Sequence, residues 1–552
     1  MFLPALANGF IDWDDGSLLL RNPWYRGLGP SNLAWMFTTV RMGHWMPLNW
    51  LSFGLDYLAW GMRPLGYHLT SVMLHSAGAA VFYLVARRLL RAALPGRAPD
   101  DRWLAWGALA AALAWAIHPL RVESVAWITE RRDVLSGLFY LSSVLLYLRY
   151  AETRAGRVYW AAVGCFALAL MSKSITASLP GVLLVMDVYP LRRLGGSVGW
   201  ITPAARRVWL EKLPFAALSV AMVAVAFWAL ASGGGLTPLR ALDVPARMAL
   251  SAYALAFYLG KTLWPVTLSP LYELALPISP LETRFLAGAL GAAAATVGAA
   301  LFRRRWPGLL AAWVAFVLTL LPVLGVAHNG YQLAADRYTY LAELGLALCV
   351  GGVVAVFRLP GASAAALVLA LWSVLTWQQV GVWRSDETLW RHAAKVDPVS
   401  GVARSNLGAA LTAGHRYAEA VSELEQAVAR RPRYAEAWNN LGLALAGAGH
   451  PEEAAARFRH AAAIRPRFAE AWNNLGVSLA VQGRRASAMD AFAHAALIDP
   501  SMAEARNNLG LALAEEGKLA EAAEEFRQAV ALNPAWQDPR RNLEQALRLL
   551  GR

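Results

Sequence analysis

Residues 437–442 read Ala-Trp-Asn-Asn-Leu-Gly, and residues 471–476 repeat the same six residues without a change. The two copies begin 34 residues apart, and the same interval separates successive prolines at Pro398, Pro432, Pro466, Pro500 and Pro534. A self-similar period of this length predicts stacked helical units, each of which buries its apolar face against its neighbours. The repeats therefore decide the fold of the C-terminal part of the chain.

The period and the placing of Trp, Leu-Gly and Pro are those of the tetratricopeptide repeat (TPR), a pair of antiparallel helices. We predict a TPR α-solenoid over residues 383–552, with about 4–5 repeats. One asparagine recurs in each first helix, and these residues are Asn406, Asn440, Asn474, Asn508 and Asn542.

The recurring asparagines have two interpretations. A primary amide both donates and accepts hydrogen bonds, so a row of amides can hold the backbone of an extended acceptor peptide whatever its sequence. Such a row resembles the asparagine ladder in the repeat superhelix of the nucleocytoplasmic O-GlcNAc transferase. In the other interpretation, Asn-Leu-Gly belongs to the packing consensus of the repeat. The sequence leaves both open.

Residues 1–382 have the composition of a membrane protein. The whole chain of 552 residues is 57% hydrophobic and 16% charged, with a mean hydropathy of +0.38, which is too apolar for a soluble globular protein. We predict an all-α polytopic membrane bundle over residues 1–382, followed by the TPR array. Its apolar segments are 66–90, 103–118, 133–150, 158–173, 175–190, 212–232, 247–267, 283–302, 308–326, 338–357 and 362–381. The stub of residues 1–9 is too short to span a bilayer and reads as the end of a truncated first span.

The net charge of +14 is interpreted through membrane topology, because the basic residues lie between apolar spans and form no single stripe. We therefore expect no nucleic-acid partner. The arginines of 91–102, 149–157, 191–211 and 303–307 place those loops inside. Residues 10–65, 118–132, 327–337, the turn at Lys173 and everything after 382 are then outside, if 247–267 is re-entrant or interfacial.

Polar residues at the mouths of these spans are the candidates for chemistry, because charge at a membrane boundary is costly unless it is solvated or functional. A solvated loop remains the alternative for Asp14 and Asp15. An outer arginine suits a phosphate ligand, and a surface pair of Arg131 with Glu130 is the alternative there. The candidates are Asp14, Asp15, His118, Glu123, Arg131, Asp133, Lys173, Asp336 and Arg337. Basic groups on three outer segments favour transfer from a membrane-anchored phosphate donor, and the sequence has no Walker A or dinucleotide-binding loop.

Five short motifs carry a resemblance to a known family. They are Asn-Gly-Phe-Ile-Asp-Trp-Asp-Asp at 8–15, Pro-Leu-Gly-Tyr-His-Leu at 64–69, His-Pro-Leu-Arg-Val-Glu-Ser-Val-Ala at 118–126, Met-Ser-Lys-Ser at 171–174 and Ala-Asp-Arg-Tyr-Thr-Tyr-Leu at 335–341. As a series they resemble bacterial relatives of the transmembrane and tetratricopeptide repeat-containing (TMTC) proteins. The resemblance covers nearly the whole chain, including the order of its two parts.

That family is similar to the protein O-mannosyltransferases, within the GT-C class of membrane glycosyltransferases. The resemblance implies inverting transfer of a sugar from a polyprenyl-phosphate donor to Ser or Thr of a protein. It implies Asp14 as the base toward the acceptor hydroxyl, with Asp15 in support. The other candidates, His118, Glu123, Arg131, Asp133, Lys173, Asp336 and Arg337, would position the lipid phosphate and the acceptor. The mannosyltransferase acid pair is commonly Asp-Glu, and this chain departs from it with Asp-Asp.

The expected partners are a polyprenyl-phosphate-linked sugar, the membrane, and an acceptor protein or peptide held by the array. We expect a bacterial inner-membrane protein with its array on the extracytoplasmic side. No cofactor and no metal ligands are expected, although the sequence does not decide whether a divalent cation takes part. Two other functions stay open: a lipid-linked glycan ligase or polymerase, and a non-catalytic membrane-anchored TPR scaffold for envelope complexes.

Overall fold

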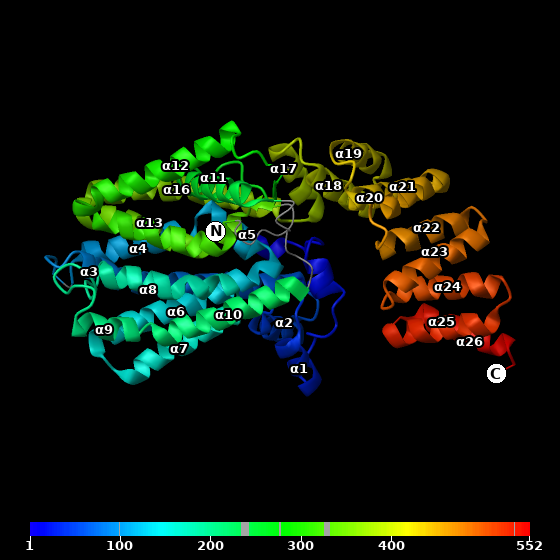
Figure 1. Ribbon diagram of the computed structural model, residues 1–552, viewed down its shortest axis with the longest axis horizontal. Helices are drawn as coiled ribbons and strands as arrows, with labels where there is room; N and C mark the ends of the chain where they lie inside the picture. The colour runs from blue at the N-terminus through cyan, green and yellow to red at the C-terminus, as the bar shows by residue number, and fades with distance from the viewer. Residues whose placement is uncertain (99, 233–241, 275–277, 325–331, 535, 552) are drawn as a thin grey trace. The chain divides into compact units, whose positions relative to one another are not determined.

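The computed structural model describes residues 1–551, apart from 99, 233–241, 275–277, 325–331 and 535. The chain forms two compact units, Met1–Leu389 and Trp390–Arg552. The division falls inside α17 (Asp386–Val396), a few residues beyond the predicted boundary at 382. Both units are helical, which confirms the predicted all-α class (Figure 1).

The helices of the first unit are α1 (Pro30–Thr38), α2 (Pro47–Trp60), α3 (Pro64–Ala93), α4 (Arg102–Ala116), α5 (Val122–Ala126), α6 (Arg131–Thr153), α7 (Gly156–Leu170), α8 (Leu179–Val188), α9 (Pro203–Leu210), α10 (Leu213–Ser232), α11 (Val244–Leu263), α12 (Thr283–Leu301), α13 (Pro307–Leu320), α14 (Thr339–Ala342), α15 (Leu344–Phe357) and α16 (Leu359–Val382). Short 3-10 turns that matter for the site are η3 (Pro119–Arg121), η4 (Ile128–Glu130) and η8 (Asp336–Tyr338). An antiparallel pair of strands, β1 (Tyr272–Glu273) with β2 (Gln332–Ala334), is a small addition that the sequence did not predict.

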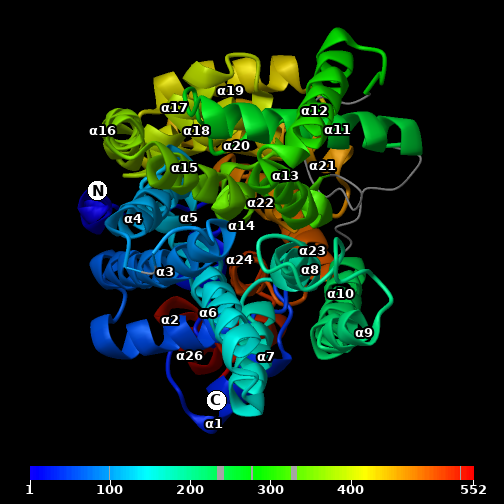
Figure 2. The ribbon, with the colours of Figure 1, turned by 90° about the vertical axis from the view of Figure 1, so that its left-hand side faces the viewer.

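Five helical stretches are long and apolar enough to cross a membrane: Pro64–Ala93, Ile128–Thr153, Pro203–Ala231, Thr283–Arg304 and Leu359–Val382. The total rises to 7 within the described residues if two bent pairs are each counted as one span. In the bundle, α6 packs against both α3 and α7 (Figure 2). Helix α11, which we expect not to cross, is not among these helices of the described chain. Residues 325–331, which include the end of the predicted segment 308–326 and the start of 327–337, lie outside the described residues.

The two bent helix pairs shape the site. A proline lies at the first bend, and the short arms of both bends contact each other. The first, Arg102–Ala116 with Pro119–Ala126, turns by 54° at His118-Pro119, where proline removes a backbone donor. The second, Asp336–Ala342 with Leu344–Phe357, turns by 57°. The short arms of the two bends contact each other, because α5 packs against η8. The bends therefore bring Glu123 and Arg337 together.

Ion pairs join predicted inner loops to one another and predicted outer segments to one another. Arg88 pairs with Glu152 at 3.7 Å, and Arg154 pairs with Glu211 at 3.2 Å, which joins the predicted inner loops. A second group of ion pairs joins the predicted outer segments around Glu130. Residues in contact lie on one side of a bilayer, so each group shares a side. Which group faces the cytoplasm stays a prediction.

The second unit is a regular array of helix pairs, which Figure 1 shows stacked from α18 to α26. The pairs are α18 (Gly401–Ala413) with α19 (Tyr417–Arg430), α20 (Ala435–Gly447) with α21 (Pro451–Ile464), α22 (Ala469–Val481) with α23 (Arg485–Ile498), and α24 (Ala503–Glu515) with α25 (Leu519–Leu532), followed by α26 (Gln537–Leu549). These four pairs agree with the predicted repeats. Each repeat packs a glycine of its first helix against an aromatic or aliphatic side chain of its second helix.

A methyl group at Gly476 tests this close packing. A Cβ there would lie 2.5 Å from a ring carbon of Phe492, so Gly476→Ala should destabilise the array by about 1–3 kcal/mol through overpacking. Hydrogen exchange of the α22 and α23 amides in the full chain would measure the loss. Adding Phe492→Leu should recover part of the protection, and a double variant no better than Gly476→Ala would contradict the steric cause.

Candidate active site

Glu130 is a fully buried carboxylate at the end of η4, directly before α6. Arg132 donates to it from Nε at 2.9 Å, Lys173 donates from Nζ at 3.0 Å, and Nε of Arg337 lies 3.1 Å away. These cations come from three separate parts of the chain. A buried carboxylate surrounded in this way is held ionised and immobile.

Two further carboxylates extend this arrangement. Glu123 accepts the backbone N–H of Arg337 at 2.9 Å and also pairs with its guanidinium. Asp133 accepts from Lys173 at 2.6 Å and from the hydroxyl of Ser124 at 3.1 Å. We call the six ionic residues the charged cluster: Glu123, Glu130, Arg132, Asp133, Lys173 and Arg337. Their three negative and three positive charges balance, which makes their burial tolerable.

Two cations of the charged cluster keep donors for a further acceptor. Arg132 uses Nε and Nη2 on Glu130, and its Nη1 makes no hydrogen bond within the described residues. Lys173 donates two hydrogen bonds, which leaves a third N–H, and its side chain is 12% exposed. A phosphate oxygen is an acceptor that both groups can serve.

Asp14 lies beside the charged cluster, in the loop that precedes the π-helical turn η2 (Gly16–Leu20). Its half-buried carboxylate makes no hydrogen bond or ion pair within the described part of the chain. Burial raises its pKa above the ordinary value of 3.8, as does Glu130, while Arg132 and Arg337 act in the opposite direction. An unpaired carboxylate with a raised pKa can accept a proton, which is what a general base requires.

Asp15 has a different environment from its neighbour. It is fully buried and accepts three hydrogen bonds: from the backbone N–H of Ile11 at 2.9 Å, from the backbone N–H of Thr129 at 3.0 Å, and from the Thr129 hydroxyl. Asp15 therefore ties the N-terminal loop to η4. It is a positioning residue that sets where Asp14 stands.

The rest of the N-terminal loop is also fixed to the first unit. The backbone N–H of Gly9 donates to the carbonyl of Arg384 at 3.1 Å, and that of Asp12 donates to Asp386 at 2.9 Å. The ring of Trp13 stacks on Trp127 with centroids 5.0 Å apart. The guanidinium of Arg337 lies 5.6 Å from the centroid of the same Trp127 ring. The loop that carries Asp14 therefore packs against Trp127, on which Arg337 also lies.

His44 is a further polar residue beside the charged cluster, from a tight turn closed by Arg41 and His44. Desolvation by the surrounding protein, followed by the nearby cation of Arg132, lowers the pKa of His44 to about 3. The imidazole is therefore neutral at pH 7 and offers one donor and one acceptor.

Arg131 lies apart from the charged cluster. It is fully buried, pairs with Asp56 and donates to the backbone carbonyl of Tyr67 at 2.5 Å. The alternative surface pair of Arg131 with Glu130 is wrong, since Glu130 pairs with Arg132 instead. The guanidinium of Arg131 is thus engaged in the buried interior and does not face the charged cluster.

His118 and Asp336 also lie outside the charged cluster. Nε2 of His118 lies 3.0 Å from the carbonyl of Thr262, and its Nδ1 accepts the backbone N–H of Leu120 at 3.2 Å, which stabilises the bend before α5. Asp336 accepts a hydrogen bond from the hydroxyl of Tyr272 at 2.9 Å. Both are buried, and the roles predicted for them stay predictions.

Of the predicted residues, the structure brings together Asp14, Glu123, Asp133, Lys173 and Arg337. Sequence reasoning missed Glu130, Arg132 and His44. Helical spacing offered a signal for Glu130, because residues three apart share a helix face and Glu130 stands three before Asp133. Arg131 is one residue from Glu130 and two from Asp133, so it points away from the helix face that those two carboxylates share. No group of three or more His, Cys, Asp or Glu within the described residues is arranged to hold a metal ion.

The asparagines of the array link successive repeats. The side-chain amides of Asn474, Asn508 and Asn542 donate to the Asn one position earlier in the preceding repeat, at 2.9–3.0 Å. Asn440 donates to Ser405 at 3.3 Å. Packing between repeats thus uses one N–H of each amide. The Oδ1 atoms of Asn440, Asn474 and Asn508 accept no hydrogen bond within the described residues, so peptide binding stays a prediction.

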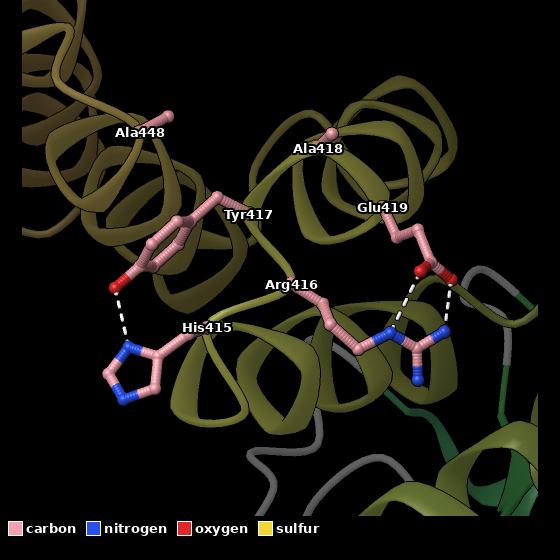
Figure 3. A pocket seen from close by; sticks show the side chains of 6 residues that line it. All are labelled: His415, Arg416, Tyr417, Ala418, Glu419 and Ala448. Atoms are coloured by element: carbon pink, nitrogen blue, oxygen red, sulfur yellow. Dashed lines mark hydrogen bonds and ion pairs between the residues drawn. The ribbon is translucent and has the colours of Figure 1, made fainter.

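The array also contains a recess of about 430 Å³ at the turn between α18 and α19 (Figure 3). There Arg416 donates to Glu419 at 2.8 Å, and the ring of His415 hydrogen-bonds the hydroxyl of Tyr417 at 2.7 Å. The predicted site residues do not line it. We assign this recess no function.

Comparison with known proteins finds relatives of both the repeats and a longer part of the chain. Family models of the tetratricopeptide repeat match residues 405–455, 440–499 and 503–536. Protein O-mannosyl-transferase Tmtc1 of Drosophila melanogaster is 27% identical, in an alignment that covers 79% of this chain and 61% of that protein. The chain is similar to the TMTC protein O-mannosyl-transferases. The resemblance carried by the five motifs is thereby confirmed.

Other TMTC proteins match shorter parts. Protein O-mannosyl-transferase Tmtc2 of D. melanogaster is 32% identical, with 36% of this chain and 21% of that protein covered. TMTC2 of Homo sapiens is 33% identical, with 27% and 17% covered. The chain spans less than two thirds of the length of these relatives.

Solved structures with similarity to part of the chain include a thermophilic TPR protein of Thermus thermophilus. It is 23% identical with a TM-score of 0.27, over 33% of this chain and 96% of that one. MamA of Desulfovibrio magneticus is 21% identical with a TM-score of 0.25, over 28% and 85%.

The buried carboxylate of Asp15 predicts that the stability of the chain depends on pH. Burial raises the pKa of Asp15 to about 7 from 3.8, against the opposing effect of its hydrogen bonds. Between about pH 4 and pH 7 the folded chain therefore binds a proton that the unfolded chain has released, so the free energy of unfolding falls as pH rises. In Asp15→Asn this contribution disappears, and the fall across that window should be smaller.

Thermal unfolding of the detergent-solubilised chain at stepped pH measures the difference. Asp12→Asn is the matched control, because the Asp12 carboxylate lies in the same loop but is exposed, with a single weak pair to Arg21 at 3.5 Å. It should keep the wild-type slope. Equal slopes in all three proteins would contradict the assignment to Asp15.

Proposed function

We propose that this chain is a membrane glycosyltransferase that moves a sugar from a polyprenyl-phosphate donor to Ser or Thr hydroxyls of a protein. The observation that supports this most directly is the unpaired Asp14 carboxylate beside two cations, Arg132 and Lys173, that keep free donors. The similarity to protein O-mannosyl-transferases gives the same reaction class. The array would hold the acceptor protein.

The proposed chemistry is a single displacement with inversion. The acceptor hydroxyl oxygen attacks the anomeric carbon and forms the new C–O bond, while its proton passes to the Asp14 carboxylate. The bond between the anomeric carbon and the phosphate oxygen breaks, and its electron pair leaves with the polyprenyl phosphate. Arg132, Lys173 and Arg337 would stabilise the charge that collects on that oxygen.

Glu130 would serve this reaction indirectly. It fixes three cations in one place before the donor arrives, so they need not reorganise as charge develops. Glu123 and Asp133 would hold the guanidinium and the ammonium from the other side. His44, neutral and next to the charged cluster, is placed to hydrogen-bond a sugar hydroxyl.

The alternative of a non-catalytic scaffold receives no support from the site. A pure anchor needs neither a pre-arranged cluster of six charges nor an unpaired carboxylate beside it, since both cost stability. The alternative of a lipid-linked glycan ligase or polymerase differs in its acceptor, and a transfer assay that offers a saccharide beside a protein would distinguish it.

Replacing the base should remove transfer. Asp14→Asn keeps the size of the side chain but cannot accept the proton, so the rate should fall by about 100-fold or more. The measurement is transfer of radiolabelled mannose from polyprenyl phosphate to protein by the purified chain, with Asp12→Asn as the control from the same loop. Full activity in a well-expressed Asp14→Asn variant would contradict the catalytic role.

The pH dependence offers a second check on Asp14. Because its pKa is raised, kcat/KM should lose activity on the acid side at a pH above the ordinary aspartate value of 3.8. The cation of Arg132 lowers the Asp14 pKa, so Arg132→Gln should move this acid limb to higher pH. The quantity to measure is the pH at which kcat/KM falls to half of its maximum on the acid side. This pH does not depend on the maximal value of kcat/KM. An unmoved limb would mean that another group controls it.

A further inference from the structure

The first helices of the array present three chemically different rows of side chains. Four residues before Asn440, Asn474, Asn508 and Asn542 stands an acid, whereas Val402 holds that position before Asn406, and the row is Glu436, Glu470, Glu504 and Asp538. Three residues after it stands an exposed aliphatic side chain in successive repeats: Leu443, Val477 and Leu511, which are 39%, 44% and 42% exposed. The amide row lies between them.

The three rows share one helix face. Positions four before and three after a residue return to the same side of an α-helix, at a rise of 1.5 Å per residue. The acidic row therefore lies about 6 Å to one side of the amide row, and the aliphatic row about 4.5 Å to the other side. The hydrogen bonds between Asn473 and Asn508, and between Asn439 and Asn474, show that these faces follow one another from repeat to repeat.

Charge on the acidic row is available to a ligand. Glu436 pairs with Arg465 and Asp538 pairs with Arg541. Glu470 and Glu504 are exposed and form no ion pair within the described residues. Exposed aliphatic side chains stand in register with these acids, so the face offers a row of charged contacts and a row of apolar contacts.

We propose that this face selects extended acceptor segments in which basic and aliphatic side chains alternate. The inference rests on the proposed role of the array in holding the acceptor. Successive side chains of an extended segment point to opposite sides. A segment that lies along the amide row, with its backbone on the asparagine Oδ1 and N–H groups, directs one set of side chains to the acidic row and the other to the aliphatic row.

The test is binding of fluorescein-labelled peptides to the full chain in nanodiscs of zwitterionic lipid, measured by anisotropy. One peptide alternates Lys with Val and contains a Ser as the acceptor. A second peptide has Glu in place of each Lys. The Lys peptide should bind about tenfold more tightly, because surface ion pairs contribute modestly and here act together. A third peptide with the Lys residues gathered at one end should bind more weakly than the alternating one.

Charge reversal gives the decisive comparison. Glu470→Lys with Glu504→Lys should reverse the preference toward the Glu peptide. The matched control is Glu425→Lys with Asp490→Lys, two exposed acids on the second helices α19 and α23, which should keep the wild-type preference. Equal affinities for the two peptides, or the same change in the control, would overturn the proposal.

Binding and transfer fail separately in this design. Asp14→Asn should bind the Lys peptide as the wild type does. Sugar transfer to Lys and Glu peptides at equal rates would overturn the selectivity and leave the proposed function standing. Selective binding without transfer in any variant would support the selectivity and remove the proposed function.

Discussion

The carboxylate of Glu130 is buried, and a buried charge is stable only where opposite charges replace the water that it has lost. Three cations meet that need, and they arrive from α6, from the turn before η5 (Ser174–Ser178) and from η8. Only Arg337 belongs to a bent helix pair, whereas Arg132 belongs to α6 and Lys173 to a turn. The two bends, of 54° and 57°, have short arms that contact each other, and Glu123 pairs with Arg337 across that contact. The ion pairs of the charged cluster thus stabilise the irregular backbone at this end of the bundle.

The equal numbers of positive and negative charges in the charged cluster do not occupy every N–H donor of its cations. A guanidinium has five N–H donors and an ammonium three, whereas a buried carboxylate offers a limited number of well-placed acceptor sites. Arg132 and Lys173 therefore stay able to bind an anion even though each is already paired. A site of this kind holds its cations in position before an anionic substrate arrives and does not need to reorganise when it does.

The repeats could be predicted from the sequence because their period repeats the same local packing, and each glycine-to-aromatic contact lies within one unit. The acid pair could be located from its motif. The pairing of Glu123 with Arg337 could not, because 214 residues separate them and no local pattern reports which loops meet. The choice between Arg131 and Arg132 was a question of helix phase. The first residue faces Asp56 in the apolar interior and the second faces Glu130, although both are arginines in one motif.

Asp14 and Asp15 show how adjacent residues of one type acquire different roles. Asp15 accepts three hydrogen bonds inside the protein, so its oxygens are engaged and its contribution is to fix the loop. Asp14 has lost much of its water without gaining a partner, which raises its pKa and leaves its oxygens available. The environment of Asp14 depends on Asp15. Without the hydrogen bonds of Asp15 that hold the loop backbone, the unpaired Asp14 carboxylate would turn outward to water. The pair therefore keeps an unsatisfied base in position by satisfying the acid beside it.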